Sequence, residues 1–269
     1  MLSELGSDCR PLAGGHSIIP MMKLRLAAPE HLVDLGGIAE LRNISVGGGS
    51  IEIGAMVTQH ELLTSAELGK ACPIIAETSA LIADPQVRYC GTLGGNVANG
   101  DPGNDMPGLM QCLNATYVLE SSSGGAREVS AREFYHGVYD TALNDGEMLT
   151  LVRIPTPLAG HGYAYSKLKR KVGDYATAAA GVIVAMSGST CQSASIALTN
   201  VGDTALYAAE ASESLAGAEL NEETIGRAAS LAEGITSPVA DMRGSEEYRK
   251  KMAGVMVARA IRLAAERAS

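Results

Sequence analysis

The order of the predicted elements constrains the fold of this 269-residue chain more than any single motif does. Between residues 115 and 199, apolar runs of strand length predict strands, and from residue 203 onwards Ala-rich segments with helical spacing predict helices. The predicted strands are residues 115–120, 127–129, 148–154, 163–168, 178–186 and 193–199, and the predicted helices are residues 203–216, 222–234 and 245–268. Strands followed by a helical cap are typical of an α+β fold, here with two or three subdomains.

Two glycine-containing turns predict hairpins. Residues 43–46 and 50–54 flank Gly47-Gly48-Gly49, and two later strands flank Ser187-Gly188-Ser189. Glycine accepts the positive φ angles that tight hairpin turns require.

The segment 89–105 has five glycines in 17 residues. It follows a helical pattern that should end before Pro85, since the residue before a proline avoids helical geometry. The segment predicts a long loop, and such loops are uncommon in a compact domain unless they have a function.

The apolar residues of the last predicted helix form one stripe. Its members are Tyr248, Met252, Val255, Met256 and Leu263, and the basic residues, Arg249 among them, lie largely off it. The sequence therefore predicts that this stripe faces the core.

The charge and hydropathy patterns exclude several classes of protein. The formal charge is −9, from 21 Lys+Arg against 30 Asp+Glu, so nucleic acid is not expected as the main partner. The most apolar run, residues 176–186, is well short of the roughly 20 residues of a membrane span. The first residues do not resemble a signal peptide, so we expect a cytoplasmic chain.

Five cysteines lie far apart, without the spacing of a zinc or iron–sulfur site. The chain also lacks the G-x-G-x-x-G, Walker and G-x-S-x-G motifs. The carboxylates Asp101 and Asp105 lack the further ligands of a calcium loop. No metal site is therefore predicted on this chain.

Two segments pair glycines before a small polar residue: Ala13-Gly14-Gly15-His16-Ser17, the first glycine loop, and Thr92-Leu93-Gly94-Gly95-Asn96, the second glycine loop. Successive N–H groups of such a backbone form a concavity that binds anions. Two facing loops could therefore grip a diphosphate without a lysine. The alternative is that both loops are only tight turns.

Four single residues have two readings each. His16 could contact a ligand or cap its loop, and Asp105 could accept a ligand hydroxyl or cap a helix that starts near residue 104. Strand alternation could point Lys167 inward, although a basic cluster such as residues 167–171 is usually solvated. Tyr175 is either an exposed loop tyrosine or a platform for ring stacking.

Four segments make the sequence recognisable: AGGHS at 13–17, TLGGN at 92–96, NGDPGNDMPGLMQCL at 99–113 and GYAYSKLKRKVGDYATAAA at 162–180. They closely resemble the FAD-binding medium subunits of molybdenum-containing carbon monoxide dehydrogenases and, more broadly, the flavin subunits of the xanthine dehydrogenase family. The resemblance covers essentially the whole chain. It implies an α+β, vanillyl-alcohol-oxidase (PCMH-type) FAD fold over residues 1–157 and a C-terminal domain over residues 158–269.

The resemblance also implies roles for individual residues. The two pyrophosphate loops match Ala13, Gly14, Gly15, His16 and Ser17, and Thr92, Leu93, Gly94, Gly95 and Asn96. Asp105 matches a cofactor-contacting acid, Leu149 and Lys167 match flavin-side positions, and Tyr175 matches a tyrosine on one face of the isoalloxazine ring. Lys167 is suited to stabilise negative charge on a reduced flavin. No catalytic acid or base is assigned to this chain.

The implied activity is electron transfer. A molybdenum-containing large subunit would oxidise CO with water to CO2, and a small iron–sulfur subunit would pass the electrons to FAD on this chain, then to a quinone or other acceptor. The expected assembly is a dimer of heterotrimers, in the cytoplasm or peripheral at the inner face of the membrane. The alternatives are the same relay for an aldehyde or N-heterocycle hydroxylase, and an assembly subunit without cofactor.

One departure from the family concerns the start of the chain. Family members normally carry about two dozen more residues before the first glycine loop, the length of an opening βα element. The implied FAD-binding domain therefore divides into an N-terminal subdomain of about residues 1–54, truncated at its start, and a middle subdomain of about residues 55–157. We expect the truncation to weaken FAD retention relative to a chain with this element restored.

Overall fold

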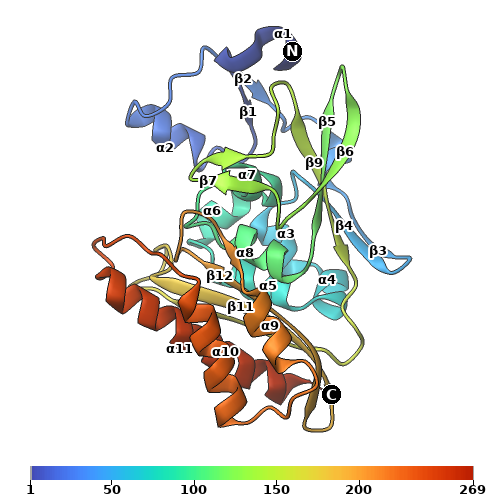
Figure 1. The fold of residues 1–269 in the computed structure, drawn as a ribbon. Helices are drawn as coiled ribbons and strands as arrows, with labels where there is room; N and C mark the ends of the chain where they lie inside the picture. Colours follow the sequence, from blue (N-terminus) through green and yellow to red (C-terminus); the bar gives the residue numbers. More distant parts are fainter. Residues whose placement is uncertain (1, 269) are drawn as a thin grey trace.

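The computed structural model describes residues 2–268, and this part of the chain contains four sheets, of which β1-β2 and β7-β8 are two-stranded (Figure 1). The strands are β1 (Cys9–Leu12), β2 (His31–Asp34), β3 (Ile44–Gly47), β4 (Ser50–Gly54), β5 (Thr116–Ser121), β6 (Gly125–Ser130), β7 (Tyr135–Gly137), β8 (Asp140–Thr141), β9 (Met148–Pro155), β10 (Gly162–Leu168), β11 (Ala178–Ser187), β12 (Thr190–Thr199) and β13 (Leu206–Tyr207). The helices are α1 (Leu2–Leu5), α2 (Ile18–Lys23), α3 (Gln59–Thr64), α4 (Ala66–Ala71), α5 (Ile74–Leu81), α6 (Pro85–Cys90), α7 (Leu93–Ala98), α8 (Asp105–Cys112), α9 (Ala209–Leu215), α10 (Glu222–Gly234) and α11 (Glu246–Arg267), and short 3₁₀ turns span Gly6–Asp8 and Ala39–Arg42. This content confirms the predicted α+β class.

The N-terminal part is a small unit at one end of the molecule (Figure 1). Its strands β1 and β2 pair in parallel, with Cys9 opposite His31 and Leu12 opposite Asp34. The first glycine loop leaves β1 and enters α2. This loop therefore lies at the carboxyl end of a strand of a parallel pair, where α/β proteins commonly bind ligands.

The central sheet is antiparallel throughout, with the strand order β3-β4-β9-β5-β6. The predicted hairpin of β3 and β4 is confirmed, and Gly48 and Gly49 of its turn have φ angles of +60° and +81°. Strands β3 and β4 lie within residues 1–54, yet β4 pairs with β9. The sheet thus includes strands from both parts of the expected FAD-binding domain, and the subdomain boundary near residue 54 stays a proposal.

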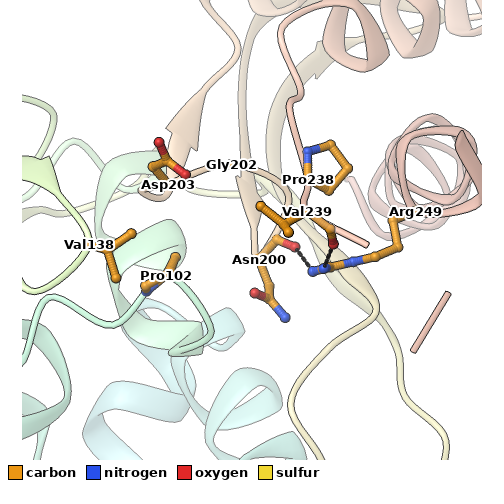
Figure 2. Close-up of a pocket in the computed structure, with 8 residues that line it drawn as sticks. All are labelled: Pro102, Val138, Asn200, Gly202, Asp203, Pro238, Val239 and Arg249. Carbon is orange, nitrogen blue, oxygen red and sulfur yellow. Dashed lines mark hydrogen bonds between the residues drawn. The ribbon is translucent and has the colours of Figure 1, made fainter. Parts of the chain in front are cut away.

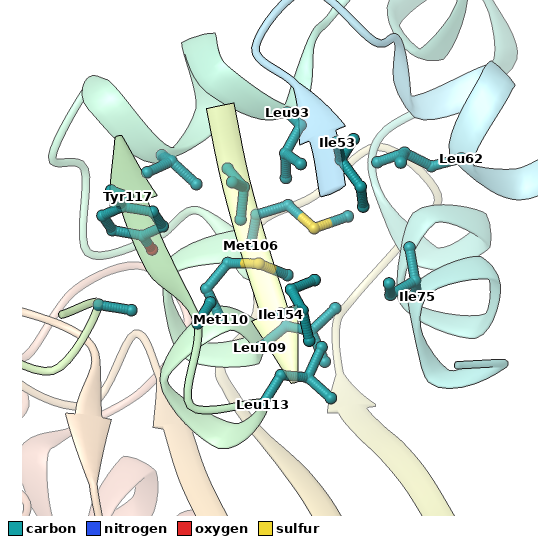
Figure 3. Packing of buried hydrophobic residues seen from close by; sticks show 14 of the residues in the cluster. Ile53, Leu62, Ile75, Leu93, Met106, Leu109, Met110, Leu113, Tyr117 and Ile154 are labelled. Atoms are coloured by element: carbon teal, nitrogen blue, oxygen red, sulfur yellow. The ribbon is translucent and has the colours of Figure 1, made fainter. Parts of the chain in front are cut away.

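Helix α8 forms the centre of the largest hydrophobic core, and each of its residues is buried. Figure 3 shows Met106 and Met110 packed among side chains of the central sheet and the neighbouring helices. The only phenylalanine, Phe134, meets Tyr117 edge to face at a ring-centroid distance of 4.8 Å. Methionine and small aliphatic residues therefore fill a core that has few large aromatic residues.

The C-terminal sheet has the order β10-β11-β12-β13, and helices α9–α11 cover one of its faces (Figure 1). Ala164 and Val182 point towards these helices, whereas Tyr165 and Ala179 belong to the central core. The sheet therefore lies between the helical cap and the rest of the chain. A Cβ on Gly162 would be 1.9 Å from the carbonyl oxygen of Ala264, so α11 packs against β10 at backbone distance.

Two secondary-structure predictions are wrong in part. The segment 89–105 is not one long loop, because α7 lies inside it and α6 and α8 reach into its ends. The predicted helix 203–216 is shorter, since residues 206–207 form β13 and the helix begins at Ala209.

The predicted stripe of α11 faces the core only in part, since Met256 is buried and three other members pack at the margin of the C-terminal core. The buried residues of this helix are Arg249, Ala253, Gly254, Met256, Val257, Ala260, Ile261 and Ala264. Tyr248 is exposed, and Met252, Val255 and Leu263 are only partly buried. The close approach of α11 to the sheet favours its face of small residues.

No helix within residues 2–268 is long and apolar enough to cross a bilayer. The five cysteines are free thiols, and only Cys90 is exposed.

Candidate cofactor-binding site

One cavity of about 1030 Å³ is lined by the β1–α2 region, by residues of α6, α7 and α8, by the segment before β9, and by the end of β10 with the loop that follows it. Thirteen of the fourteen predicted site residues line it: Ala13, Gly14, Gly15, His16, Ser17, Thr92, Gly94, Gly95, Asn96, Asp105, Leu149, Lys167 and Tyr175. Leu93 does not, because its side chain is fully buried in the central core. The fold thus gathers segments that are far apart in the sequence around one space.

The first glycine loop packs directly against Cys90 and Gly91, the residues that precede the second glycine loop. A Cβ on Gly14 would lie 2.1 Å from the carbonyl oxygen of Cys90, and Gly15 has a φ of +73°. Among residues 2–268, no acceptor is found for the backbone N–H groups of Gly14, Gly15, His16 and Ser17. These N–H groups are therefore available to hold an anion at the cavity wall.

The second glycine loop is the first turn of α7 rather than an irregular loop. Thr92 is the N-cap residue, and its Oγ1 accepts a 3.0 Å hydrogen bond from the N–H of Gly95. The N–H of Gly94 donates to the carbonyl of Ala55 at 2.9 Å. Because these N–H groups are bonded within the protein, the expected cradle of free N–H groups applies to the first loop only.

The glycines of the second loop make room for close packing instead. A Cβ on Gly94 would be 2.5 Å from the Cβ of Ala55, and a Cβ on Gly95 would be 3.5 Å from the Cβ of Ala13. The second glycine loop therefore packs against the first and supports it. The side chains of Thr92 and Asn96 add polar groups to the cavity wall.

A buried ion pair connects two walls of the cavity. Lys167 Nζ lies 2.6 Å from Asp105 Oδ2, and the two side chains are only 1% and 5% exposed. The hydroxyl of Tyr165 donates to Asp105 Oδ1 at 2.8 Å and lies 3.2 Å from Thr199 Oγ1. Burial and the Asp105 carboxylate raise the pKa of Tyr165, so this hydroxyl stays protonated as a donor.

Sequence reasoning found only part of this network. Of the two readings left for Lys167, the structure supports the inward one, and strand alternation places Tyr165 on the same face of β10. Thr199 belongs to another strand, and no local pattern connects it to Asp105. Asp105 is the first residue of α8, as expected, but its carboxylate binds Lys167 and Tyr165 rather than capping the helix.

Asp101 holds Tyr175 at the cavity. The Tyr175 hydroxyl donates to Asp101 Oδ2 at 3.1 Å, and the Tyr139 hydroxyl lies 3.3 Å from the same oxygen. Tyr175 is 43% exposed and also lines the cavity, so its role as a platform for ring stacking stays a prediction. Burial, followed by the Asp101 carboxylate, raises the pKa of Tyr175, so its hydroxyl is protonated at neutral pH. Asp101 was missed as a positioning residue because the sequence does not show that Tyr175 lies nearby.

The segment before β9 forms another wall, which includes Leu149. Arg127 on β6 fixes this wall: its Nε lies 2.7 Å from Glu147 Oε1, and its Nη2 lies 2.7 Å from Oε2. The N–H of Asn144 also donates to Glu147 Oε2, at 2.8 Å. The hydrogen bonds from Arg127 are the main reason why the pKa of Glu147 falls to about 2.

Low pH should weaken the interaction between Arg127 and Glu147 and so destabilise this wall of the cavity. The pKa of Glu147 in the folded chain is about 2, below the value of about 4.3 expected in the unfolded chain. The stabilisation is therefore complete above the unfolded pKa and is lost as the pH falls towards 2. We expect Glu147→Gln to lower the urea midpoint at neutral pH and to reduce its dependence on pH below about 4.5. Identical pH dependence of the two urea midpoints would contradict this role of Glu147.

A smaller pocket of about 140 Å³ lies beside the C-terminal sheet (Figure 2). Its polar wall includes Arg249, which is 4% exposed. The guanidinium donates to the carbonyls of Thr177 at 3.2 Å, Val239 at 2.6 Å and Asn200. Arg249 of α11 therefore connects this helix to the residues before β11, after β12 and between α10 and α11.

Comparisons with known families match both halves of the chain. The family described as the FAD binding domain in molybdopterin dehydrogenase matches residues 1–157. The family described as the CO dehydrogenase flavoprotein C-terminal domain matches residues 163–264.

Individual relatives match over nearly their full length. The chain is 59% identical to the carbon monoxide dehydrogenase medium chain of Afipia carboxidovorans, covering 100% of this chain and 93% of the relative. It is 34% identical to the glyceraldehyde dehydrogenase medium chain of Sulfolobus acidocaldarius, covering 96% and 92%. A solved structure of reconstituted CO dehydrogenase from Oligotropha carboxidovorans matches with a TM-score of 0.98 and 60% identity, covering 99% of this chain and 93% of that one.

Proposed function

The chain belongs to the family of FAD-binding subunits of molybdopterin dehydrogenases, and we propose that it is the medium, electron-transferring subunit of a carbon monoxide dehydrogenase. The 59% identity to a carbon monoxide dehydrogenase medium chain, over the whole of this chain, is the observation that supports this substrate. FAD is the cofactor of the subunit. The alternative of an assembly subunit without cofactor is therefore set aside.

The cavity fits this cofactor on chemical grounds. We propose that the free N–H groups of Gly14, Gly15, His16 and Ser17 hold the diphosphate, since an anion would satisfy backbone donors that otherwise lack an acceptor. Gly14 and Gly15 allow a close approach of the ligand because they have no side chain. This arrangement explains how a chain with a formal charge of −9 can bind a diphosphate.

At the other end of the cavity, we propose that Leu149, Lys167 and Tyr175 line the isoalloxazine ring. FAD, when bound, accepts and releases electrons in single or paired steps. Lys167 places a positive charge at the cavity wall, and Asp105 balances this charge through the 2.6 Å ion pair. The pair therefore holds the ammonium in one position, from which it can favour negative charge on the ligand.

The partners follow from the same proposal. A molybdenum-containing large subunit would oxidise CO with water to CO2, two electrons and two protons, and a small iron–sulfur subunit would deliver the electrons to this chain. We further propose a quinone or similar acceptor, a dimer of heterotrimers, and a peripheral position at the inner face of the membrane.

A spectroscopic experiment tests the proposed function. The chain would be co-expressed with its partner subunits, and the purified complex would be exposed to CO under anaerobic conditions. We expect bleaching of the flavin absorbance near the oxidised maximum, and no bleaching when CO is replaced by argon. A complex that contains FAD but does not respond to CO would contradict the proposed substrate.

The second candidate is the same relay in a hydroxylase for another substrate, an aldehyde or an N-heterocycle. The 34% identity to a glyceraldehyde dehydrogenase medium chain favours it, because the fold evidently serves more than one substrate. Aldehydes and N-heterocycles tested in the same anaerobic assay separate the two candidates. Bleaching by an aldehyde but not by CO would establish the second candidate.

A further inference from the structure

Strand β10 is an edge strand of the C-terminal sheet, and two side chains from other elements bond to its outer backbone groups. Glu77 of α5 accepts a 2.6 Å hydrogen bond at Oε1 from the N–H of Tyr165. Arg267 of α11 donates from Nη1 to the carbonyl of Tyr163 at 2.9 Å, and the same nitrogen lies 2.6 Å from Glu77 Oε2. The carboxylate of Glu77 thus replaces the strand that would otherwise pair with β10 at this point.

The same strand carries two donors of the buried network. Residues 163, 165 and 167 share one face of β10, because side chains alternate along a strand. The hydroxyl of Tyr165 and the ammonium of Lys167 occupy the two carboxylate oxygens of Asp105. The position of the β10 backbone therefore determines how these two groups meet Asp105.

Helix α5 holds β10 at a second point. The carbonyl of Leu81, the last residue of α5, accepts hydrogen bonds from Lys167 Nζ at 3.3 Å and from Lys169 Nζ at 3.0 Å. Glu77 lies one turn before Leu81 on the same helix. A single helix thus fixes both the backbone at Tyr165 and the ammonium of Lys167.

Glu77 differs from the network residues in its surroundings. Its side chain is 24% exposed, and it is not among the described residues that line the large cavity. It cannot contact a molecule in that cavity directly. The hydrogen bonds of Glu77 connect it to the cavity through Tyr165, and from there through Lys167 and Asp105.

We propose that Glu77 is a positioning residue for the flavin site. By binding the backbone of the edge strand, it sets the Lys167–Asp105 pair at the cavity wall and thereby sets the FAD affinity and the flavin redox potential. This inference rests on the proposed function, because it takes the cavity to be the FAD site.

The test uses the complex of the chain with its partner subunits. Glu77→Ala is expected to weaken FAD binding about tenfold, the effect expected if the displaced Lys167 loses one charge-assisted interaction with the ligand. In protein saturated with FAD, we expect a more negative flavin midpoint potential, because Lys167 no longer holds its place beside the ring. Glu77→Gln keeps an amide oxygen as acceptor for the Tyr165 N–H and should restore most of the affinity.

A double variant shows whether the effect passes through Lys167. If it does, Glu77→Ala combined with Lys167→Met should have the same midpoint potential as Lys167→Met alone. Additive shifts, or a Glu77→Ala protein with unchanged potential and affinity, would overturn the proposal. The exposed pair of Glu222 and Arg262 provides a matched control, since Glu222→Ala removes an ion pair between α10 and α11 that makes no hydrogen bond to β10.

Hydrogen exchange of backbone amides measures the effect of Glu77 on β10 without any assay of activity. The Tyr165 amide should exchange faster in Glu77→Ala, whereas the amide of Ile196 in β12, which donates to Ser212 of α9, should be unaffected. Equal exchange of Tyr165 in the wild-type and variant proteins would also overturn the proposal. If the wild-type complex contained no FAD, the proposed function would fail before any variant is compared.

Discussion

Asp105→Ala is expected to lower the free energy of unfolding by about 3–5 kcal/mol, the largest stability loss expected from one substitution at the cavity. The substitution leaves the Lys167 ammonium in a site where its side chain is 1% exposed, without the carboxylate that balances it. It also removes an acceptor from the buried hydroxyl of Tyr165. Urea unfolding measures the loss, and the FAD content of the purified complex should fall with it.

A double variant distinguishes an unpaired charge from simple loss of packing. Asp105→Leu with Lys167→Met removes both charges and fills the space with apolar groups of similar size, so most of the lost stability should return. If the double variant is as unstable as Asp105→Ala, the ion pair is not the cause. Glu222→Ala at an exposed ion pair should change the urea midpoint little, since solvent screens such pairs.

The elements that the sequence predicts well are those whose signals are local. The β3–β4 hairpin depends on consecutive glycines in its turn, and α10 has the predicted bounds of residues 222–234. Asn221 caps α10 in a capping box with Thr224, so its start is set by neighbouring residues. Such features need no information about the rest of the chain.

The wrong predictions concern features that depend on contacts between segments far apart in the sequence. The apolar stripe of α11 suggests a face that includes Tyr248, but Tyr248 is exposed, and the buried face follows Ala253, Ala260 and Ala264 instead. Gly162 and Ala264 meet at backbone distance, so the small residues face inward. Arg249 is buried on the same face because three backbone carbonyls of other segments accept its donors. The helical pattern of α11 alone contains none of this information.

In the candidate site too, local sequence signals predict some features, and contacts between distant segments determine the others. Glycine pairs and strand alternation indicate the first glycine loop and the inward direction of Lys167. The geometry of the second loop depends on Ala55, whose carbonyl binds the N–H of Gly94. Likewise, Glu77 and Tyr165 are 88 residues apart, so only the folded chain reveals their contact.

Gly14→Ala is expected to reduce retention of FAD by the complex strongly. The new Cβ would lie 2.1 Å from the carbonyl oxygen of Cys90 and 2.8 Å from the Cα of Gly91, and both are backbone atoms that cannot turn aside. The first glycine loop must therefore move away from the second, which takes its free N–H groups out of position. Losing two charge-assisted hydrogen bonds to the diphosphate would weaken binding about a hundredfold. Gel filtration followed by flavin quantification measures the retention, and titration with FAD measures the affinity.

The matched control is a glycine with open space around it. Gly226 lies on the exposed side of α10, where a Cβ would meet nothing within 4 Å. Gly226→Ala should retain FAD fully and gain up to about 1 kcal/mol, because alanine favours a helix over glycine. Gly14→Ala should instead lose stability, by about 1–3 kcal/mol, through overpacking. A Gly14→Ala complex with a full complement of FAD would show that the contact between the two loops does not control binding, and the diphosphate would then have to be held elsewhere in the cavity.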